Sequence, residues 1–309
     1  MATELISLSN ELASAVERAA AGIVAVHARR GIGSSGIVWR DNLILTSAEG
    51  IRTDEGIKLV LPNDSVVPAR LRGRDPGTDL AVLEIDAAHA TGLRPLEFAD
   101  DTAVRAGQLA LAVGRTANTG PIASFGIVSG VSGEWKTWRG GAIDPFVRLD
   151  IAVYPTQSGG AALDADGKVV GLISTGLSRS SVFAVTSKTI DRIAGKLNDQ
   201  GHVSRGFLGI TMQPVALPPE VQEKLKQESG IMVLGIEPGG PAATGGLIMG
   251  DVLVAANGRP IAEPDALADL LERSPAGETV TFRVLRAGVE KDVSVRLGER
   301  PAGRRSHGR

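Results

Sequence analysis

The stretch that decides the fold is Tyr154-Pro155-Thr156-Gln157-Ser158-Gly159-Gly160-Ala161-Ala162-Leu163. The chain enters it from an extended run at 147–153 and leaves it through a second extended run at 168–174. Taken alone, a serine followed by two glycines indicates only a flexible turn, because glycine turns are common in every fold. The segments upstream decide whether Ser158 marks something more specific.

Two segments upstream of Ser158 indicate the role of the serine loop. Residues 43–49 read Leu-Ile-Leu-Thr-Ser-Ala-Glu, and residues 74–83 read Arg-Asp-Pro-Gly-Thr-Asp-Leu-Ala-Val-Leu. With the serine loop, they resemble the three active-site segments of chymotrypsin-like serine proteases, and the strand 168–174 resembles that of the bacterial HtrA branch. The resemblance implies that Ser158 stands at the nucleophile position, Asp79 at the catalytic aspartate and Glu49 at the catalytic histidine.

The residue at position 49 decides the expected chemistry. In a serine protease, an imidazole takes the proton of the serine hydroxyl and later gives it to the leaving amine. Histidine suits both steps because its unperturbed pKa is ~6.5. Glutamate, with an unperturbed pKa of ~4.3, is a weaker base and is already ionised when an acid is needed. We therefore expect Ser158 to lack its base. If Glu49 and Asp79 lie close together, we expect repulsion between the two carboxylates to raise the pKa of one of them.

No other histidine stands at an obvious position to compensate. His27 falls in the first predicted strand, His89 in the loop after Ile85, His202 in the interdomain linker and His307 in the tail. Rescue by one of them would need an unusual loop, and this is the alternative to a missing base.

The oxyanion hole is the second departure from the family pattern. The resemblance places a glycine two residues before the nucleophile, where its N–H joins that of Ser158, and this chain has Thr156 there. A β-branched residue disfavours positive φ, so we expect the loop not to present two convergent donors. Losing one such donor typically costs ~100- to 1000-fold in turnover. Gln157 and Ala161 likewise replace the asparagine and proline common in the family.

Length and composition set the broad class. A chain of 309 residues predicts about two domains, and 43% hydrophobic with 22% charged residues is ordinary for a soluble globular protein. The formal net charge of −2 gives no electrostatic argument for nucleic acid or an anionic membrane as partner. Because the chain has no cysteine, disulfides and thiolate metal sites are excluded. We predict no cofactor and no metal site.

The N-terminal segment predicts a location as well as a helix. Residues 1–21 carry Leu5, Leu8, Leu12 and Val16 at helical spacing, which predicts an amphipathic helix. This helix either packs on the first domain or mediates self-association into a homo-oligomer. It lacks the basic start and unbroken apolar core of a signal peptide, and no segment reaches the ~20 apolar residues that span a bilayer. From these features we predict a cytoplasmic location, although HtrA relatives are often exported.

Residues 22–198 read as short strands separated by Gly, Asp and Pro clusters, which predicts a mostly β domain. The resemblance implies a chymotrypsin-like pair of six-stranded barrels with the site between them. In that arrangement Glu49 and Asp79 come from the first barrel and Ser158 from the second. A closing helix is expected at 186–198, with Ile190, Ile193, Ala194 and Leu197 on one face.

A second domain follows a polar linker at 199–204. Residues 205–210, Arg-Gly-Phe-Leu-Gly-Ile, resemble the carboxylate-binding loop of a PDZ domain, and 239–243, 247–253 and 256–261 match it further. We therefore predict a PDZ domain, a small β-sandwich or barrel with helices, at 205–298, and a tail at 299–309. Its helix is expected at 263–273, and its hairpin at 279–285 and 291–297.

A PDZ domain binds by β-augmentation: a peptide adds as a strand to an open sheet edge while backbone N–H groups capture its C-terminal carboxylate. The residues that we expect to form the loop and edge strand are Arg205, Gly206, Phe207, Leu208, Gly209 and Ile210. Ala266, Leu267 and Leu270 are expected to line the groove, with plain helix packing as the alternative. Arg205 has the alternative of an exposed linker charge.

Two functions follow from these features. The first is an HtrA-like pseudoprotease that binds extended or C-terminal peptides, or unfolded segments, through its PDZ domain. The second is an active HtrA-type endopeptidase that degrades unfolded proteins through an unrecognised base or a rearranged loop. Glu49 and Thr156 are separate lesions in one mechanism and favour the first, whereas fold analogy alone would favour the second.

Overall fold

The structure is a computed structural model that describes residues 2–28, 33–137, 140–178, 180–203 and 205–299. The chain divides into two compact units, Met1–Val203 and Ser204–Arg309. Met1, Ser204 of the predicted linker, and the part of the predicted tail that carries His307 lie outside the described residues. Each unit has its own core, and each is described by itself.

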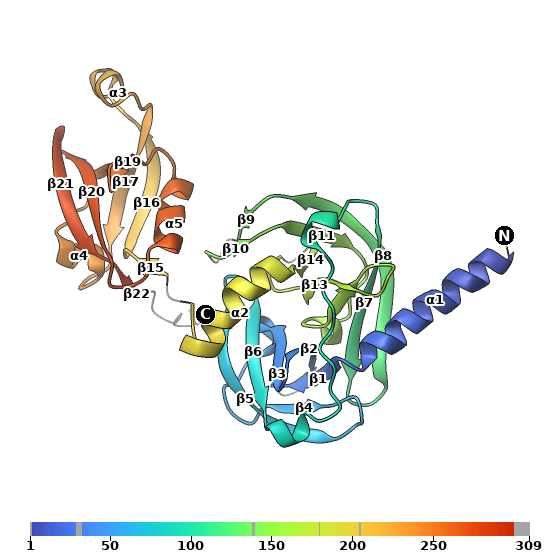
Figure 1. The fold of residues 1–309 in the computed structure, drawn as a ribbon. Coiled ribbons are helices and arrows are strands. Elements are labelled where there is room, and N and C mark those ends of the chain that lie inside the picture. The colour runs from blue at the N-terminus through green and yellow to red at the C-terminus, as the bar shows by residue number, and fades with distance from the viewer. Residues whose placement is uncertain (1, 29–32, 138–139, 179, 204, 300–309) are drawn as a thin grey trace, which may run out of the picture. The chain divides into compact units, whose positions relative to one another are not determined.

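Two closed six-stranded barrels form the body of the first unit, as the sequence predicts (Figure 1). The first barrel has the strand order β1-β2-β3-β6-β5-β4, and β1 also pairs with β4 to close it. Its strands are β1 (Ile23–His27), β2 (Ser34–Arg40), β3 (Leu43–Ser47), β4 (Lys58–Val60), β5 (Val66–Asp75) and β6 (Leu80–Ile85), with short 3₁₀ turns η1 (Ala48–Gly50) and η2 (Ala87–His89).

The second barrel has the order β11-β14-β13-β12-β7-β8 and is closed by the pairing of β8 with β11. Its elements are β7 (Leu109–Thr116), β8 (Gly120–Ser132), β11 (Phe146–Asp150), β12 (Ala161–Leu163), β13 (Val169–Ser174) and β14 (Val182–Val185), together with η3 (Asp101–Ala103), η4 (Pro155–Gln157) and the two-stranded sheet of β9 (Trp135–Lys136) and β10 (Ala142–Ile143). The predicted mostly β, two-barrel domain is confirmed.

One apolar cluster joins the two barrels. Ile37 and Leu45 of the first barrel pack in the same cluster as Val113 and Leu172 of the second. Burying these side chains together stabilises the pair of barrels as one unit, and so holds the loops that connect their strands in fixed positions. The candidate site lies among those loops.

Two helices pack on the barrels. α2 (Ser187–Gln200) buries Ile190, Ile193, Ala194 and Leu197, the four residues predicted for its inner face, and runs two residues past the predicted end. α1 (Ala2–Ala20) buries Ala15 and Ala19, while Leu5 and Ile6 near its start are exposed. Figure 1 shows its first turns extending away from the barrels.

The second unit is the predicted PDZ domain, built on a sheet of order β16-β17-β18-β20-β21 with β19 beside β18. Its core surrounds Phe282, which is fully buried. Its elements are β15 (Gly206–Phe207), β16 (Ile210–Ala216), α3 (Pro219–Leu225), β17 (Ser229–Ile236), α4 (Pro241–Gly245), β18 (Val252–Ala256), β19 (Arg259–Pro260), α5 (Pro264–Arg273), β20 (Thr279–Arg286), β21 (Val289–Arg296) and β22 (Gly298–Glu299). Strand β16 is an edge of this sheet, and this edge is where a peptide strand could add.

Candidate functional site

The serine loop is a tight helical turn between β11 and β12. Residues Pro155–Gln157 form η4, and Ser158 follows as its C-cap. Gly159 has a φ of +83°, and a Cβ there would lie 2.3 Å from the carbonyl oxygen of Ser35, so only glycine fits. Thr156 is not among the residues with positive φ. The loop therefore runs through Thr156 as a right-handed turn.

Gln157 fixes this turn from inside. Its side chain is buried, and its Oε1 accepts from the Tyr154 amide at 2.8 Å and from Ser124 Oγ at 3.2 Å. Its Nε2 donates to the carbonyl oxygen of Ala112 on β7 at 2.8 Å. These bonds attach the turn to the wall of its own barrel. The residue that replaces the family's asparagine is thus a structural anchor.

Ser35 on β2 holds the same loop from the first barrel. Its amide donates to the carbonyl oxygen of Ser158 at 2.9 Å, and its Oγ donates to the carbonyl oxygen of Thr156 at 2.6 Å. The Oγ also accepts from the amide of Arg115 at 2.8 Å. Sequence reasoning missed Ser35, although a serine in an apolar strand signals a buried polar contact.

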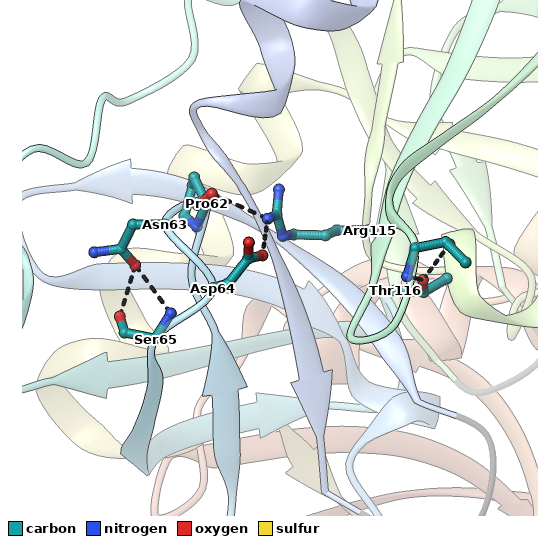
Figure 2. A network of polar contacts seen from close by, with 7 residues as sticks. Pro62, Asn63, Asp64, Ser65, Arg115 and Thr116 are labelled. Carbon is teal, nitrogen blue, oxygen red and sulfur yellow. Dashed lines mark hydrogen bonds and ion pairs between the residues drawn. The ribbon is translucent and has the colours of Figure 1, made fainter.

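Arg115 extends this contact between the barrels. Its side chain is only 5% exposed, and its guanidinium donates to the carbonyl oxygen of Pro62 at 3.1 Å and to Asp64 Oδ1 at 2.8 Å. Figure 2 shows the guanidinium reaching the 62–65 turn of the first barrel from β7 of the second. Because the pair joins the two barrels, it restrains their relative position next to the serine loop.

Asp79 is fully buried at the end of the 75–79 turn, with a φ of +56° that aspartate tolerates better than most residues. Its carboxylate accepts from Ser47 Oγ at 2.9 Å, from Ser174 Oγ at 2.6 Å and from the amide of Glu49 at 2.9 Å. Burial raises the pKa of Asp79 above its ordinary value, these hydrogen bonds oppose the rise, and the charge of Glu49 adds a smaller upward contribution.

The structure brings Asp79 and the backbone of Glu49 together, while the Glu49 side chain is exposed. Ser158 is 6% exposed, and its Oγ accepts a hydrogen bond from Thr175 Oγ1 at 3.1 Å. Within the described residues, no histidine hydrogen-bonds to Asp79 or Ser158: His27 lies in β1, His89 in η2, and His202 lies beside the carbonyl of Gln200. The groups around the serine hydroxyl and the aspartate are hydroxyls and amides.

The 206–210 loop of the second unit presents backbone donors. The carbonyl oxygen of Leu208 accepts from the Ala242 amide at 2.9 Å, and that of Gly209 accepts from the Glu237 amide at 2.8 Å. In a planar trans peptide, the following N–H points opposite to the carbonyl. The N–H groups of Gly209 and Ile210 therefore point away from the groups that hold the loop. Two neighbouring amides in this orientation can both donate hydrogen bonds to an anion.

The side chains beside this loop come from β16 and α5. Ile210, Met212, Ala266 and Leu270 are half-buried against the domain core. Leu267 is fully buried in that core and presents no surface to a ligand, which is the packing role that the sequence left as its alternative. This arrangement places half-buried apolar side chains on one face of β16 and on the neighbouring helix α5.

Arg205, just before the loop, is not an exposed linker charge. Its side chain is 17% exposed, and its Nε lies 4.0 Å from Oε1 of Glu272 on α5. Gly206 and Phe207 pair as β15 with β22. The start of the loop is thus held by a strand on one side and by the end of α5 on the other.

Neither a metal cluster nor a membrane span is found in the described part of the chain. No group of three or more His, Cys, Asp or Glu residues there could hold a metal ion. No described helix combines the length and apolar character needed to cross a bilayer.

The chain resembles known proteins over both units. It matches the trypsin-like peptidase domain over residues 34–172 and the PDZ domain over residues 232–286. A protein of Halomonas elongata, named a probable periplasmic serine endoprotease, DegP-like, is 31% identical over 285 residues, covering 91% of this chain and 59% of its own length. A Bartonella henselae protein of the same name is 33% identical, covering 87% and 53%. The chain thus spans between half and three fifths of these relatives.

Solved structures give the same answer for the fold. The HtrA-type protease AlgW with a decapeptide superposes with a TM-score of 0.74 at 26% identity, covering 94% of this chain and 99% of the other. The serine endoprotease from Yersinia pestis superposes with a TM-score of 0.74 at 29% identity, covering 93% and 97%.

The relatives correct the prediction of location and support the resemblance of the whole chain to HtrA proteins. The predicted cytoplasmic location is wrong, because the curated relatives are named periplasmic, which points to the periplasm. The prediction failed because it rested on residues 1–21 lacking a signal-peptide pattern, and the pattern of one segment does not determine the compartment. With matches to a trypsin-like peptidase domain and a C-terminal PDZ domain, and with DegP-like relatives and HtrA-type structural neighbours, the chain is HtrA-like in fold and domain order.

Proposed function

We propose that this protein is an HtrA-type peptide-binding protein whose peptidase site does not cleave. The observation that carries the proposal is the environment of Asp79, whose carboxylate is bonded by Ser47, Ser174 and the amide of residue 49. The side chain at position 49 is an exposed carboxylate. An ionised carboxylate at that position cannot act as the acid that protonates the leaving amine.

The serine loop supports the same proposal. The carbonyl oxygen of Thr156 is held by Ser35, and the turn is anchored by the buried side chain of Gln157. A right-handed turn directs the amides of residues 156 and 158 differently from a loop that contains a positive-φ residue at position 156. Stabilising an oxyanion needs donors already aimed at the developing charge, and this turn does not favour such an arrangement.

An active endopeptidase is the second candidate. It is favoured by the names of the relatives, which are serine endoproteases, and by the preserved hydrogen-bonded setting of Asp79. It needs a base for Ser158 that the described residues do not supply by hydrogen bonding. A hydroxyl of Thr175, the partner of Ser158, is too weak a base at neutral pH to replace imidazole.

The PDZ unit is the part that we propose to bind ligand. The AlgW structures similar to this chain contain a decapeptide or a tripeptide. Here the outward amides of Gly209 and Ile210 lie at the start of the edge strand β16, and half-buried apolar side chains come from β16 and α5. We propose that this edge takes the C-termini or extended segments of proteins, and that an apolar last residue suits the lining.

The peptidase proposal is tested with a fluorophosphonate probe, which needs an activated serine. We expect no labelling of Ser158 and no measurable cleavage of unfolded casein. Glu49→His alone restores little, because Thr156 still disturbs the oxyanion hole, whereas Glu49→His with Thr156→Gly is the minimal repair. Robust cleavage by the unmodified chain that is abolished by Ser158→Ala would establish the endopeptidase instead.

A further inference from the structure

One ion pair lies at the N-terminal end of the candidate carboxylate-binding loop. Arg205 immediately precedes the loop, and Glu272 lies in the last turn of α5, with 4.0 Å between Arg205 Nε and Glu272 Oε1. The two backbones are close as well: a Cβ on Gly206 would lie 2.7 Å from the carbonyl oxygen of Ser274 and 3.1 Å from that of Leu271. The pair therefore connects the loop to the C-terminal end of the groove helix.

One carboxylate oxygen of Glu272 is buried without a hydrogen bond from the described residues. This atom is Oε1, and both side chains of the pair are 17% exposed. A carboxylate removed from water depends on hydrogen bonds as well as on an opposite charge. At 4.0 Å, Arg205 Nε and Glu272 Oε1 attract each other electrostatically, but they are too far apart for a charge-assisted hydrogen bond.

A peptide carboxylate on the loop would meet better partners. The amides of Gly209 and Ile210 point outward and could donate to it. The Arg205 side chain is long enough to turn from the end of α5 toward the loop that it precedes, because arginine has four rotatable side-chain bonds. The incoming carboxylate and that of Glu272 would then compete for one guanidinium.

We propose that Glu272 is an internal competitor for the ligand carboxylate: it holds Arg205 while the groove is empty and releases it to a free peptide C-terminus. This inference rests on the proposed peptide-binding function. It assigns Glu272 a role in specificity, since only ligands that carry a terminal carboxylate can take Arg205 from it. Ligands without that charge add to the β16 edge and leave the pair intact.

The test compares one peptide in two forms on the full chain. A labelled library of peptides ending in Val, Leu, Ile or Phe is titrated, and the tightest sequence is then prepared as the free acid and as the C-terminal amide. Glu272→Gln removes the charge of the competitor and keeps its shape, so the free acid should bind about three- to tenfold more tightly while the amide binds as before. Glu220→Gln, at an exposed position on α3, makes the same change in net charge away from the loop and should alter neither affinity.

The double variant Arg205→Gln with Glu272→Gln should lose the gain, because the contested guanidinium is gone. Thermal unfolding of each variant checks that the domain is intact. If Glu272→Gln weakens both peptide forms equally, or changes neither, the pair is a structural latch and the inference fails while peptide binding stands. If neither form binds to any variant, the peptide-binding function itself fails and the inference with it.

Discussion

Asp79 keeps its carboxyl group fully buried, and no imidazole of the described residues is bonded to it. In an intact triad, the aspartate is useful because it stabilises the imidazolium formed during catalysis. Among the described residues, the carboxylate of Asp79 is hydrogen-bonded by Ser47, Ser174 and the amide of residue 49. Burial of the carboxylate outweighs these hydrogen bonds and raises the pKa of Asp79. The ionised form of Asp79 is therefore less favourable in the folded chain than in the unfolded chain.

We expect Asp79→Asn to be neutral or stabilising at neutral pH, by up to about 2 kcal/mol in the free energy of unfolding. The amide oxygen can accept from the residue-49 amide, and the amide nitrogen can donate to Ser174, whose hydroxyl is donor and acceptor alike. Because the folded pKa is raised, the folded state holds the proton more readily than the unfolded state. The Asp79 contribution to stability therefore falls as pH rises from the ordinary value of 3.8 through the folded pKa.

Denaturant unfolding of both chains at pH 4 and pH 8 checks this prediction. The advantage of the asparagine variant should be larger at pH 8 than at pH 4, because the contribution of Asp79 to stability falls as the pH rises. Equal destabilisation at both pH values would mean that the hydrogen bonds of Asp79 outweigh its burial.

At the scale of an element, η4 decides how Ser158 is presented. A three-residue helical turn has too few internal hydrogen bonds to persist alone. It forms here because Gln157 attaches it to β7 and β8 and because Ser35 holds the carbonyl oxygens of Thr156 and Ser158 from β2. The conformation of the serine loop is therefore set by strands from both barrels.

Gln157→Ala should destabilise the first unit by about 2–3 kcal/mol, since it leaves the Ala112 carbonyl and the Tyr154 amide without their buried partner. Gln200→Ala, at the exposed end of α2, is the matched control and should cost no more than about 0.5 kcal/mol. Denaturant titration monitored by tryptophan fluorescence measures both, because all three tryptophans lie in the first unit. A cost for Gln157→Ala as small as that of the control would show that η4 does not need this anchor.

At the scale of the whole molecule, the two units carry separate cores. The cluster around Phe282 contains only residues of the second unit, and the barrels share theirs with α1 and α2. Independent cores predict that each unit can fold alone. The short strand β22 belongs to the second unit, where it pairs with β15 at the start of the candidate carboxylate loop.

We expect the fragment 204–309 to unfold cooperatively and to bind the same peptides as the full chain. A fragment that ends at Leu297 lacks β22, and it should bind them about two- to tenfold more weakly because Gly206 and Phe207 lose their strand partner. Circular dichroism on heating and peptide titration measure the two properties. A non-cooperative transition for 204–309 would contradict independent folding. If the two fragments bound peptide with equal affinity, β22 would have no role in ligand binding.

The local sequence pattern by itself determined a mostly β first domain of short strands and its closing helix, whereas the pair of barrels and the PDZ domain followed from the resemblance of its motifs to known families. Strand alternation, helical periodicity and turn glycines act over a few residues, so they are readable without knowing what packs where. The assignment of Glu49, Asp79 and Ser158 came from the resemblance of three segments to those of a protease family, and the structure brings Asp79 and the amide of residue 49 together.

Only the tertiary structure decided which groups surround those residues. The contacts of Ser174 with Asp79, of Ser35 with Thr156 and of Glu272 with Arg205 join positions separated by 95, 121 and 67 residues (272 − 205 = 67). Such pairs depend on how strands and helices pack, and no local pattern encodes them. The sequence could not decide which face of α5 lines the groove, because Leu267 and Leu270 are three residues apart and lie on the same side of a helix. Packing buries Leu267 in the core and leaves Leu270 half-buried.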